Sequence, residues 1–333
     1  MSRPIPIVCV TGASGYIGSH VVDLLLSQGY RVRGTVRSVK NENKVKHLAK
    51  YTTLELFEAD LLQQKSFAKA FSGCTYVIHV ASPFQLLVSD PQKELVDPAV
   101  NGTVNVLTAA RDAGVSRVVL TSSIAAVEGL HGRMSKPGVV LSEKDWNTTS
   151  SLTKDPYAFS KVEAEKAAWA FVKANPSLEL AVINPGFVIG PSLSAREDAT
   201  SMKLVKTWVG GMFAKRGAPH GYIPSVDVRD VALGHIRAMI QPNAKDKRFL
   251  FTATRKPYSF LELFDMISSE YPQFPLPRTL SKRKPKRKTY PPIADNSRAT
   301  DILRIHFIPI DESIRDMVRD MIRKRLINLN SNL

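Results

Sequence analysis

Residues 5–29, IPIVCVTGASGYIGSHVVDLLLSQG, carry the pattern that decides the fold. The largely apolar start predicts a short buried strand, and the stretch from residue 19 onward has the apolar spacing of a helix. Between them lies the motif G-x-x-G-x-x-G at residues 12–18. Glycines at this position let the backbone turn tightly and approach a pyrophosphate at the amino end of the helix. The strand and helix on either side make this motif a prediction of a dinucleotide-binding βαβ unit.

The same alternation of strands and helices continues to about residue 185. Strands that alternate with helices imply right-handed crossovers and a parallel sheet. We therefore predict an α/β fold: a doubly wound parallel Rossmann sheet with a smaller, mostly C-terminal substrate-binding lobe. Further strands are predicted over residues 30–37, 54–61, 75–82, 116–123 and 178–186, and further helices over 63–73, 93–114 and 155–175.

Beyond residue 185 the alternation fails. A helix signature returns at residues 226–240, residues 241–290 are rich in loops and proline, and residues 311–327 form an amphipathic helix. That helix is expected to pack on the second lobe, with a membrane-surface helix as the alternative. We predict an NADP-binding Rossmann domain over residues 1–183 plus about 225–240, and a substrate-binding lobe over about 184–224 plus 241–333.

Composition indicates a globular protein with an anionic ligand. The 333 residues are 44% hydrophobic and 23% charged, with a formal net charge of +16. Six basic residues fall between Lys282 and Lys288, which indicates a solvated loop or else a nuclear signal, a nucleic-acid patch or an acidic-lipid contact. No aromatic residues interleave with this run, so nucleic acid is not the expected partner. The remaining excess charge suits a small anion.

Cellular location and assembly are predicted only broadly. Cys9 and Cys74 lie far apart, form no metal or redox motif, and are expected to be buried thiols in a reducing compartment. No secretory signal or apolar stretch of membrane-spanning length is apparent. We expect a cytoplasmic protein, a monomer or homodimer, with no metal site.

The second predicted strand ends at Val36 and Arg37. An NAD site would usually place an acidic residue there for the ribose 2′-hydroxyl, whereas arginine can bind a 2′-phosphate. Lys44 follows closely and could assist. The sequence therefore predicts NADP(H) as the cofactor. Asp60 and Leu61, which end the third strand, are placed to meet the adenine.

Tyr157 and Lys161 share one face of the predicted helix at residues 155–175. Reduction of a carbonyl by hydride leaves an alkoxide that needs a proton, and a phenol with a pKa near 10 is a poor acid–base at neutral pH. A nearby lysine cation is expected to lower that pKa. A serine from residues 121–123 can hydrogen-bond the substrate oxygen. Tyrosine, lysine and serine thus form a chemically complete catalytic set.

These motifs together resemble an extended short-chain dehydrogenase/reductase of the NAD(P)-dependent epimerase-dehydratase family. TGASGYIG with a later serine and YAFSK carries the resemblance, and VIHVASPF, INPGFVIGP and PSVDVRDVALGHIRAM narrow it to the dihydroflavonol reductase-like branch. The resemblance implies Tyr157 as proton donor, Lys161 as a ligand of the nicotinamide ribose, and Ser123 rather than Ser122 as the group that polarises the carbonyl. It also suggests Asn101 for a proton relay.

The resemblance extends to the cofactor and substrate contacts. The substrate side is mostly apolar, which favours a small, largely uncharged aldehyde or ketone. The implied cofactor-binding residues are Gly12, Ser14, Gly15, Tyr16, Ile17, Gly18, Arg37, Lys44, Asp60, Leu61, Ala81, Ser82, Tyr157, Lys161, Pro185, Phe187 and Val188. The implied substrate-binding residues are Phe84, Ser123, Ala125, Phe187 and Tyr222, with Leu86, Val127 and Trp208 also near the pocket.

Three functions compete at this level. The first is an NADPH-dependent carbonyl reductase. A hydroxysteroid dehydrogenase or nucleotide-sugar epimerase of the same superfamily is the second, although no nucleotide-sugar signature or apolar anchor is apparent. The third is a redox-sensing protein that holds NADP without turnover, and loss of the tyrosine or lysine would support it. Both residues are intact.

Overall fold

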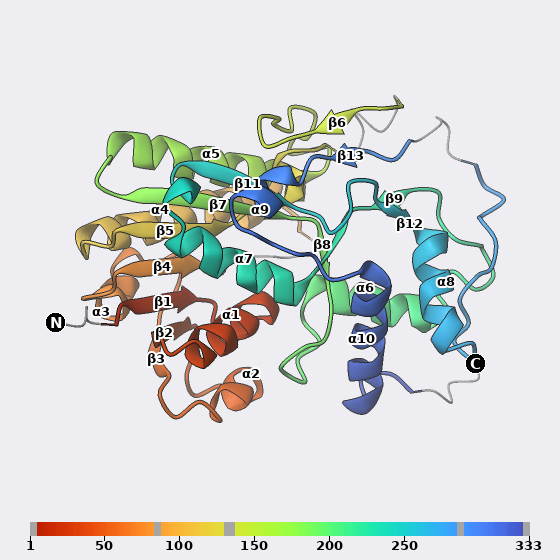
Figure 1. Ribbon diagram of the computed structural model, residues 1–333, viewed down its shortest axis with the longest axis horizontal. Helices are drawn as coiled ribbons and strands as arrows, with labels where there is room; N and C mark the ends of the chain where they lie inside the picture. Colours follow the sequence, from red (N-terminus) through yellow and green to blue (C-terminus); the bar gives the residue numbers. More distant parts are fainter. Residues whose placement is uncertain (1–4, 83–87, 130–136, 285–289, 329–333) are drawn as a thin grey trace.

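The computed structural model describes residues 5–82, 88–129, 137–284 and 290–328. A parallel sheet of seven strands organises it, in the order β11-β7-β5-β4-β1-β2-β3 (Figure 1). This arrangement confirms the predicted doubly wound α/β fold. The strands are β1 (Ile7–Thr11), β2 (Arg31–Val36), β3 (Glu55–Glu58), β4 (Tyr76–His79), β5 (Arg117–Thr121), β7 (Glu179–Pro185) and β11 (Lys247–Phe251).

Side-chain alternation along the strands builds two separate cores. In β1, Val8 and Val10 face one side of the sheet, and Cys9 faces the other. The first core is covered by α1 (Tyr16–Ser27), α7 (Val228–Ile240) and α9 (Ser297–Asp301). The second is covered by α3 (Ala68–Phe71), α4 (Asp97–Asp112) and α5 (Pro156–Ala174). Burial on both faces explains why the central strands β1, β4 and β5 are largely apolar.

The edge strand β11 corrects the sequence prediction for residues 241–290. That region was expected to be rich in loops and to lie with the substrate-binding lobe, yet Lys247–Phe251 pairs with β7 in the main sheet. Phe249, Leu250 and Phe251 are fully buried. A strand of five residues that begins with two cations gives little periodic signal, so only pairing with β7 reveals it.

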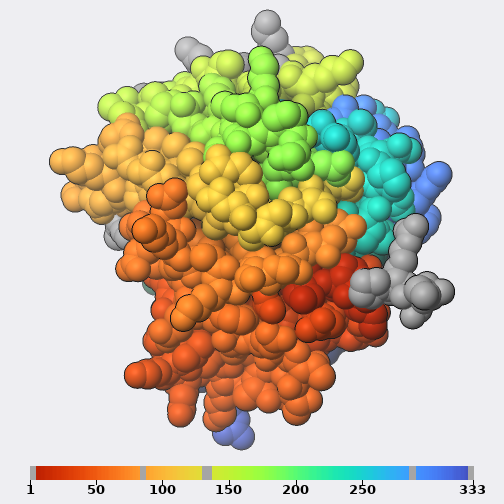
Figure 2. All heavy atoms as spheres, turned by 90° about the vertical axis from the view of Figure 1, so that its left-hand side faces the viewer, coloured from red at the N-terminus to blue at the C-terminus, as the bar shows by residue number. Residues whose placement is uncertain are grey.

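A smaller C-terminal lobe lies beyond the carboxyl ends of the strands (Figure 1). We use this name for α6 (Thr200–Val209), α8 (Phe260–Glu270) and α10 (Ile310–Arg323) with the short pairs of β8 (Phe187–Ile189) and β10 (Ser225–Asp227), and of β9 (Tyr222–Ile223) and β12 (Tyr258–Ser259). When the molecule is viewed from the left-hand side of Figure 1, the visible surface is formed mainly by the first half of the chain (Figure 2). Two-residue strands β6 (Val140–Leu141) and β13 (Ile293–Ala294) also pair, and α2 (Glu42–Val45) follows β2.

The predicted amphipathic tail forms α10 and packs within the lobe. Ile314, Met317, Val318 and Met321 are at most 1% exposed and share a core with α6 and α8. This packing supports the first of the two roles expected for this helix.

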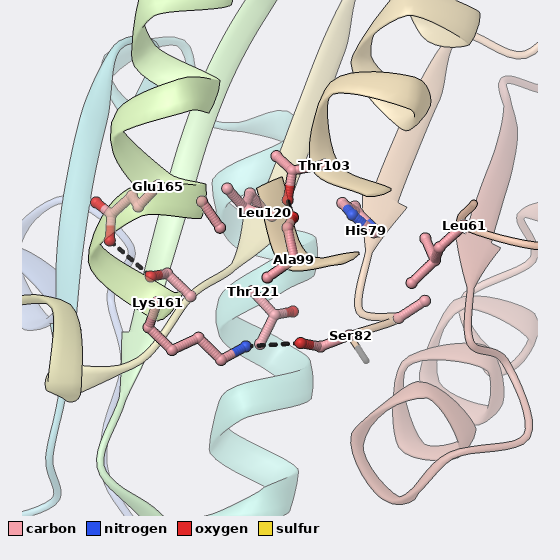
Figure 3. Close-up of a pocket in the computed structure, with 12 residues that line it drawn as sticks. Leu61, His79, Ser82, Ala99, Thr103, Leu120, Thr121, Lys161 and Glu165 are labelled. Carbon is pink, nitrogen blue, oxygen red and sulfur yellow. Dashed lines mark hydrogen bonds between the residues drawn. The ribbon is translucent and has the colours of Figure 1, made fainter. Parts of the chain in front are cut away.

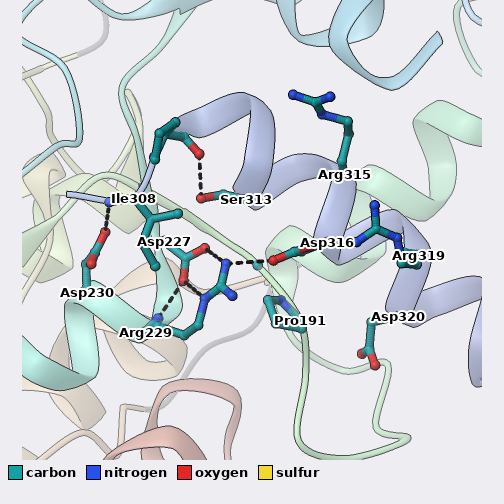
Figure 4. A network of polar contacts seen from close by, with 12 residues as sticks. Pro191, Asp227, Arg229, Asp230, Ile308, Ser313, Arg315, Asp316, Arg319 and Asp320 are labelled. Atoms are coloured by element: carbon teal, nitrogen blue, oxygen red, sulfur yellow. Dashed lines mark hydrogen bonds and ion pairs between the residues drawn. The ribbon is translucent and has the colours of Figure 1, made fainter. Parts of the chain in front are cut away.

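Partly buried ion pairs connect α10 to the beginning of α7. Asp227 is fully buried, and Arg229 pairs with it and with Asp316 of α10 (Figure 4). The carboxylate of Asp230 accepts a hydrogen bond from the Ile308 backbone at 2.8 Å. Paired charges of this kind are costly to break from one side, so they fix the lobe against the sheet.

The packing of α10 can be tested with a matched pair of isoleucines. Ile314 is fully buried, whereas Ile240 at the end of α7 is 41% exposed. Ile314→Ala should lower the free energy of unfolding by about 2–5 kcal/mol, because it removes buried methyl groups and leaves a cavity. Ile240→Ala should change it by less than about 1 kcal/mol. Equal effects in urea unfolding would contradict the buried position of α10.

Candidate active site

A helix cap fixes the position of Tyr157 and Lys161. Asp155 has a positive φ of 60° and its carboxylate accepts a hydrogen bond from the Ala158 backbone at 3.3 Å. Pro156 occupies the first helical position, where its missing N–H costs nothing. The start of α5 is therefore set two residues before the tyrosine. Both predicted catalytic side chains then lie on the helix face toward the carboxyl ends of the strands.

Lys161 is buried against the loop after β4. Its Nζ donates to Ser82 Oγ at 2.8 Å and lies 5.8 Å from the ring centroid of Tyr157 (Figure 3). Burial lowers the pKa of Lys161 from 10.5 to about 8, and the negative charge of Glu165 partly opposes this effect. The ammonium group of Lys161 therefore loses its proton at a pH only slightly above neutral.

Tyr157 differs from the expectation in one respect. Its pKa was expected to fall beside the lysine, but burial raises it, and a side-chain hydrogen bond with Ser123 opposes this only in part. The physical reason is that desolvation of the buried phenol disfavours its charged form, and the nearby negative charge of Asp155 adds to this effect. The phenol is therefore protonated at neutral pH but is a weaker acid than free tyrosine, so release of its proton depends on groups that stabilise the phenolate during the reaction.

The two serines that follow β5 have different hydrogen-bond partners. Ser122 Oγ donates to Glu165 Oε2 at 2.6 Å, so this hydroxyl is committed to a buried carboxylate. Ser123 Oγ accepts from the Ala125 backbone at 3.1 Å and bonds with Tyr157. The geometry supports the prediction that Ser123, not Ser122, faces the reacting group.

Glu165 was missed by the sequence analysis. Its fully buried carboxylate pairs with Arg248 of β11, Nε to Oε1 at 2.5 Å, and accepts from Asn184 Nδ2 at 2.8 Å. Asn184 also donates to the Ser123 carbonyl at 3.1 Å. Helix α5 and strands β5, β7 and β11 are thereby tied together directly behind the catalytic side chains. A glutamate on a helix carries no signal for such a role, because its partners come from distant strands.

The glycine turn fits the phosphates of a dinucleotide. Gly12 has φ +67°, and a Cβ there would lie 3.0 Å from Ala81 Cα. At Gly18 a Cβ would lie 2.2 Å from the Gly12 carbonyl oxygen, so the turn and α1 are in direct backbone contact. Gly15 caps α1 without a side chain, and the first turn holds no acidic residue. The amino end of α1 therefore offers its backbone N–H groups to an anion.

Most other predicted cofactor residues follow the carboxyl ends of β2, β3 and β4, which lie on the same edge of the sheet as the turn after β1. Arg37 is exposed directly after β2, and Lys44 is half-buried in α2. Asp60 Oδ1 accepts from the Leu62 backbone at 2.9 Å, and the Leu61 carbonyl accepts from Asn105 of α4 at 2.8 Å. Ser14 is buried, and Tyr16, Ile17 and Ala81 are half-buried. Ser82 is exposed.

The chain passes from the sheet to the C-terminal lobe beside Pro185. Gly186 lies so close to Pro224 that a Cβ would come within 2.3 Å of the Pro224 carbonyl oxygen. That oxygen accepts from the Phe187 backbone at 2.7 Å. Pro185, Phe187 and Val188 therefore sit at the carboxyl edge of the sheet, where the nicotinamide was predicted.

The predicted substrate residues are only partly brought together. Phe187 stacks near Trp208, with ring centroids 5.6 Å apart, and Trp208 meets Phe260 at 5.8 Å. Ala125 and Tyr222 are half-buried. Val127 and Trp208 do not line an open surface, because they are 1% and 2% exposed in two separate cores. Phe84 and Leu86 lie outside the described residues.

A cavity of about 20 Å³ lies behind Lys161, lined by Ser82, Thr121 and Thr103 among others (Figure 3). This volume is enough for about one water molecule. Asn101 is exposed on α4 and does not line the cavity, so the structure does not support it as a proton relay. The residues of α4 that line the cavity are Ala99 and Thr103.

The remaining expectations concern surface and environment. Cys9 and Cys74 are buried free thiols, as expected. The basic run continues from Lys284 into residues 285–289, which lie outside the described residues, so its role stays a prediction. In the described part of the chain, no helix has both the length and the apolar character to cross a bilayer.

Known proteins resemble this chain over nearly its full length. Residues 8–251 match the model of the NAD dependent epimerase/dehydratase family. Cinnamoyl-CoA reductase CAD2 of Medicago truncatula is 38% identical over 330 residues, which are 97% of this chain and 98% of that protein. Anthocyanidin reductase ((2S)-flavan-3-ol-forming) of Vitis vinifera is 34% identical over 294 residues, 84% of this chain and 85% of that protein.

Solved structures show the same likeness. Yeast methylglyoxal/isovaleraldehyde reductase Gre2 complexed with NADPH superimposes with a TM-score of 0.81 at 27% identity, covering 96% of this chain and 99% of that one. Gre2 in complex with NADPH from Candida albicans gives a TM-score of 0.79 at 31% identity, with the same coverage.

The influence of Glu165 on Lys161 can be measured directly. Glu165→Gln should lower the pKa of Lys161 further below about 8, because the carboxylate charge favours the ammonium form. The pKa can be followed by NMR titration of labelled lysine side chains, with the signal assigned through Lys161→Met. Glu163→Gln, on the same helix but paired with Lys166, is the matched control and should leave the pKa unchanged. A rise or no change in Glu165→Gln would contradict this electrostatic coupling.

Proposed function

The chain belongs to the NAD dependent epimerase/dehydratase family, and we propose that it is an NADPH-dependent reductase of a small, largely uncharged aldehyde or ketone. The family and the reductases that resemble it along its whole length make the chain an oxidoreductase. The observation that carries the proposal is the convergence of Tyr157, Lys161 and Ser123 on one edge of the sheet, beside a turn that fits dinucleotide phosphates.

Each catalytic side chain has a defined task in this proposal. When bound, NADPH supplies the hydride. Ser123 donates a hydrogen bond to the substrate carbonyl and polarises it. Tyr157, which is protonated at neutral pH, gives its proton to the alkoxide oxygen, and Lys161 stabilises the phenolate that remains. The hydrogen bond between Ser123 and Tyr157 supports these roles, because it shows that both hydroxyl groups can reach one substrate oxygen.

The apolar side chains support a largely uncharged substrate. Phe187 and Phe260 are half-buried and contact Trp208, which packs with Phe264 in the core of the C-terminal lobe. Burying a charged group beside such rings without a partner would be costly. A compact carbonyl compound with an apolar substituent is therefore the preferred class.

A thioester carbonyl is the second candidate substrate. Cinnamoyl-CoA reductase relatives, together with the net charge of +16, favour a substrate that carries phosphate groups. Reduction of a thioester would break the C–S bond, and the thiol leaves with a proton while the aldehyde forms. A screen that follows NADPH absorbance over aldehydes, diketones, ring ketones and acyl-CoA esters tests both classes, and released thiol identifies the second. Absence of NADPH oxidation with every class would favour the non-catalytic alternative.

Tyr157→Phe tests the proton donor. The variant should lose carbonyl reduction by at least about 100-fold, because general acid catalysis contributes roughly 10²–10⁴-fold. The NADPH dissociation constant, measured by fluorescence titration, should stay within a few-fold. Substantial turnover in this variant would refute the mechanism, and loss of NADPH binding would instead show a structural defect.

Arg37→Asp tests the assignment of the cofactor. Replacing the guanidinium by a carboxylate removes a partner of the 2′-phosphate and supplies an acceptor for a ribose hydroxyl. The ratio of kcat/KM for NADPH to that for NADH should therefore fall by about 10-fold or more. An unchanged cofactor preference would contradict the phosphate assignment.

A further inference from the structure

The loop between β8 and α6, residues 190–199, lies against the glycine turn. The Tyr16 hydroxyl donates to the Gly190 carbonyl at 2.6 Å, and His20 Nε2 lies 2.8 Å from the Pro191 carbonyl. In the opposite direction, Arg196 Nη1 donates to the carbonyl and the hydroxyl of Ser14, at 2.7 and 3.0 Å. The lobe thus reaches the cofactor turn with a guanidinium group.

The guanidinium of Arg196 is held in a defined orientation. Its Nε donates to Asp198 Oδ1 at 2.9 Å, and its Nη2 pairs with the other carboxylate oxygen. The Arg196 side chain is 18% exposed, whereas that of Asp198 is 50% exposed. A two-point ion pair fixes the plane of the guanidinium, so its Nη1 faces Ser14. No large movement is needed to offer this group to a ligand at the turn.

The cations Lys44, Lys50 and Lys324 act electrostatically on Asp198 or His47, the two groups that Arg196 also influences. Burial, followed by the charge of Arg196, lowers the pKa of His47 to about 4. The hydrogen bond from Arg196 and, more weakly, the charge of Lys44 lower the pKa of Asp198. Lys44 is one of the two residues proposed for the 2′-phosphate. Gathered positive charge of this kind raises the local concentration of anions, so the site is suited to a phosphate.

We propose that Arg196 is a further cofactor-binding residue, which binds the adenosine 2′-phosphate of NADP(H) beside Arg37 and Lys44 and holds the C-terminal lobe over the cofactor. This inference rests on the proposed function. A phosphate oxygen is a stronger acceptor for a guanidinium group than the neutral carbonyl of Ser14. Arg196 therefore has a partner on the turn in the free protein and a better one when the phosphate is present.

Calorimetric binding to NADPH, NADH and adenosine 2′,5′-bisphosphate tests the proposal without turnover. Arg196→Gln should weaken NADPH and the bisphosphate by about 10-fold, the amount expected for one hydrogen bond to a charged group. Its affinity for NADH should change by less than about 2-fold. Arg196→Lys, which keeps the positive charge but cannot form the two-point pair, should recover part of the lost NADPH affinity. Arg216→Gln, an exposed arginine in the same lobe, controls for the loss of one positive charge.

The outcomes separate this inference from the proposed function. If the unaltered protein binds neither NADPH nor the bisphosphate, the proposed function fails. If Arg37→Asp loses NADPH selectively but Arg196→Gln does not, only this inference fails. Equal weakening of NADPH and NADH would place Arg196 at the pyrophosphate and overturn it. Should Arg196→Gln lower the thermal midpoint, Arg196→Lys decides, because it keeps the positive charge: an NADPH affinity no higher than that of Arg196→Gln would overturn the proposal.

Discussion

The buried ion pair between Glu165 and Arg248 is the constraint on which the site depends. A carboxylate and a guanidinium taken out of water are stable only when every remaining donor and acceptor is satisfied. The Glu165 carboxylate accepts further hydrogen bonds from Ser122, Asn184 and Trp169. Arg248 donates to the backbone carbonyls of Glu143 and Asp145, and its guanidinium carbon lies 3.9 Å from the centroid of a Trp146 ring. Helix α5, residues 122–123 after β5, and edge strand β11 cannot move separately without breaking these hydrogen bonds and the ion pair.

The sequence was sufficient for the parts of the fold that repeat. Apolar strands that alternate with helices, and a glycine turn before a helix, can be recognised from neighbouring residues alone. Parallel strands also bring their carboxyl ends to one edge of the sheet, which predicts where the site lies. Tyr157 and Lys161 could be paired from their spacing alone. Strand β11 could not be found in this way, because its burial depends on β7 and its charged end belongs to the ion pair with Glu165.

Quantities that depend on burial were also beyond the sequence. The pKa of Tyr157 was expected to fall because opposite charges attract, yet desolvation is the larger effect and raises it. Similarly, nothing near Arg196 in the sequence indicates a contact with Ser14, since the lobe brings the two together. Residue types predict which chemistry is available, but the competition between charge and desolvation is decided only in three dimensions.

The cap at Asp155 separates the catalytic helix from the segment before it. Because the register of α5 starts afresh at this residue and Pro156, a change of length in residues 142–153 need not shift Tyr157 along the helix axis. The same segment leads from the serine loop and β6 toward the substrate side. Loop exchange between related enzymes could therefore be made with its downstream junction at Asp155, altering which molecule is accepted while the proton donor keeps its place.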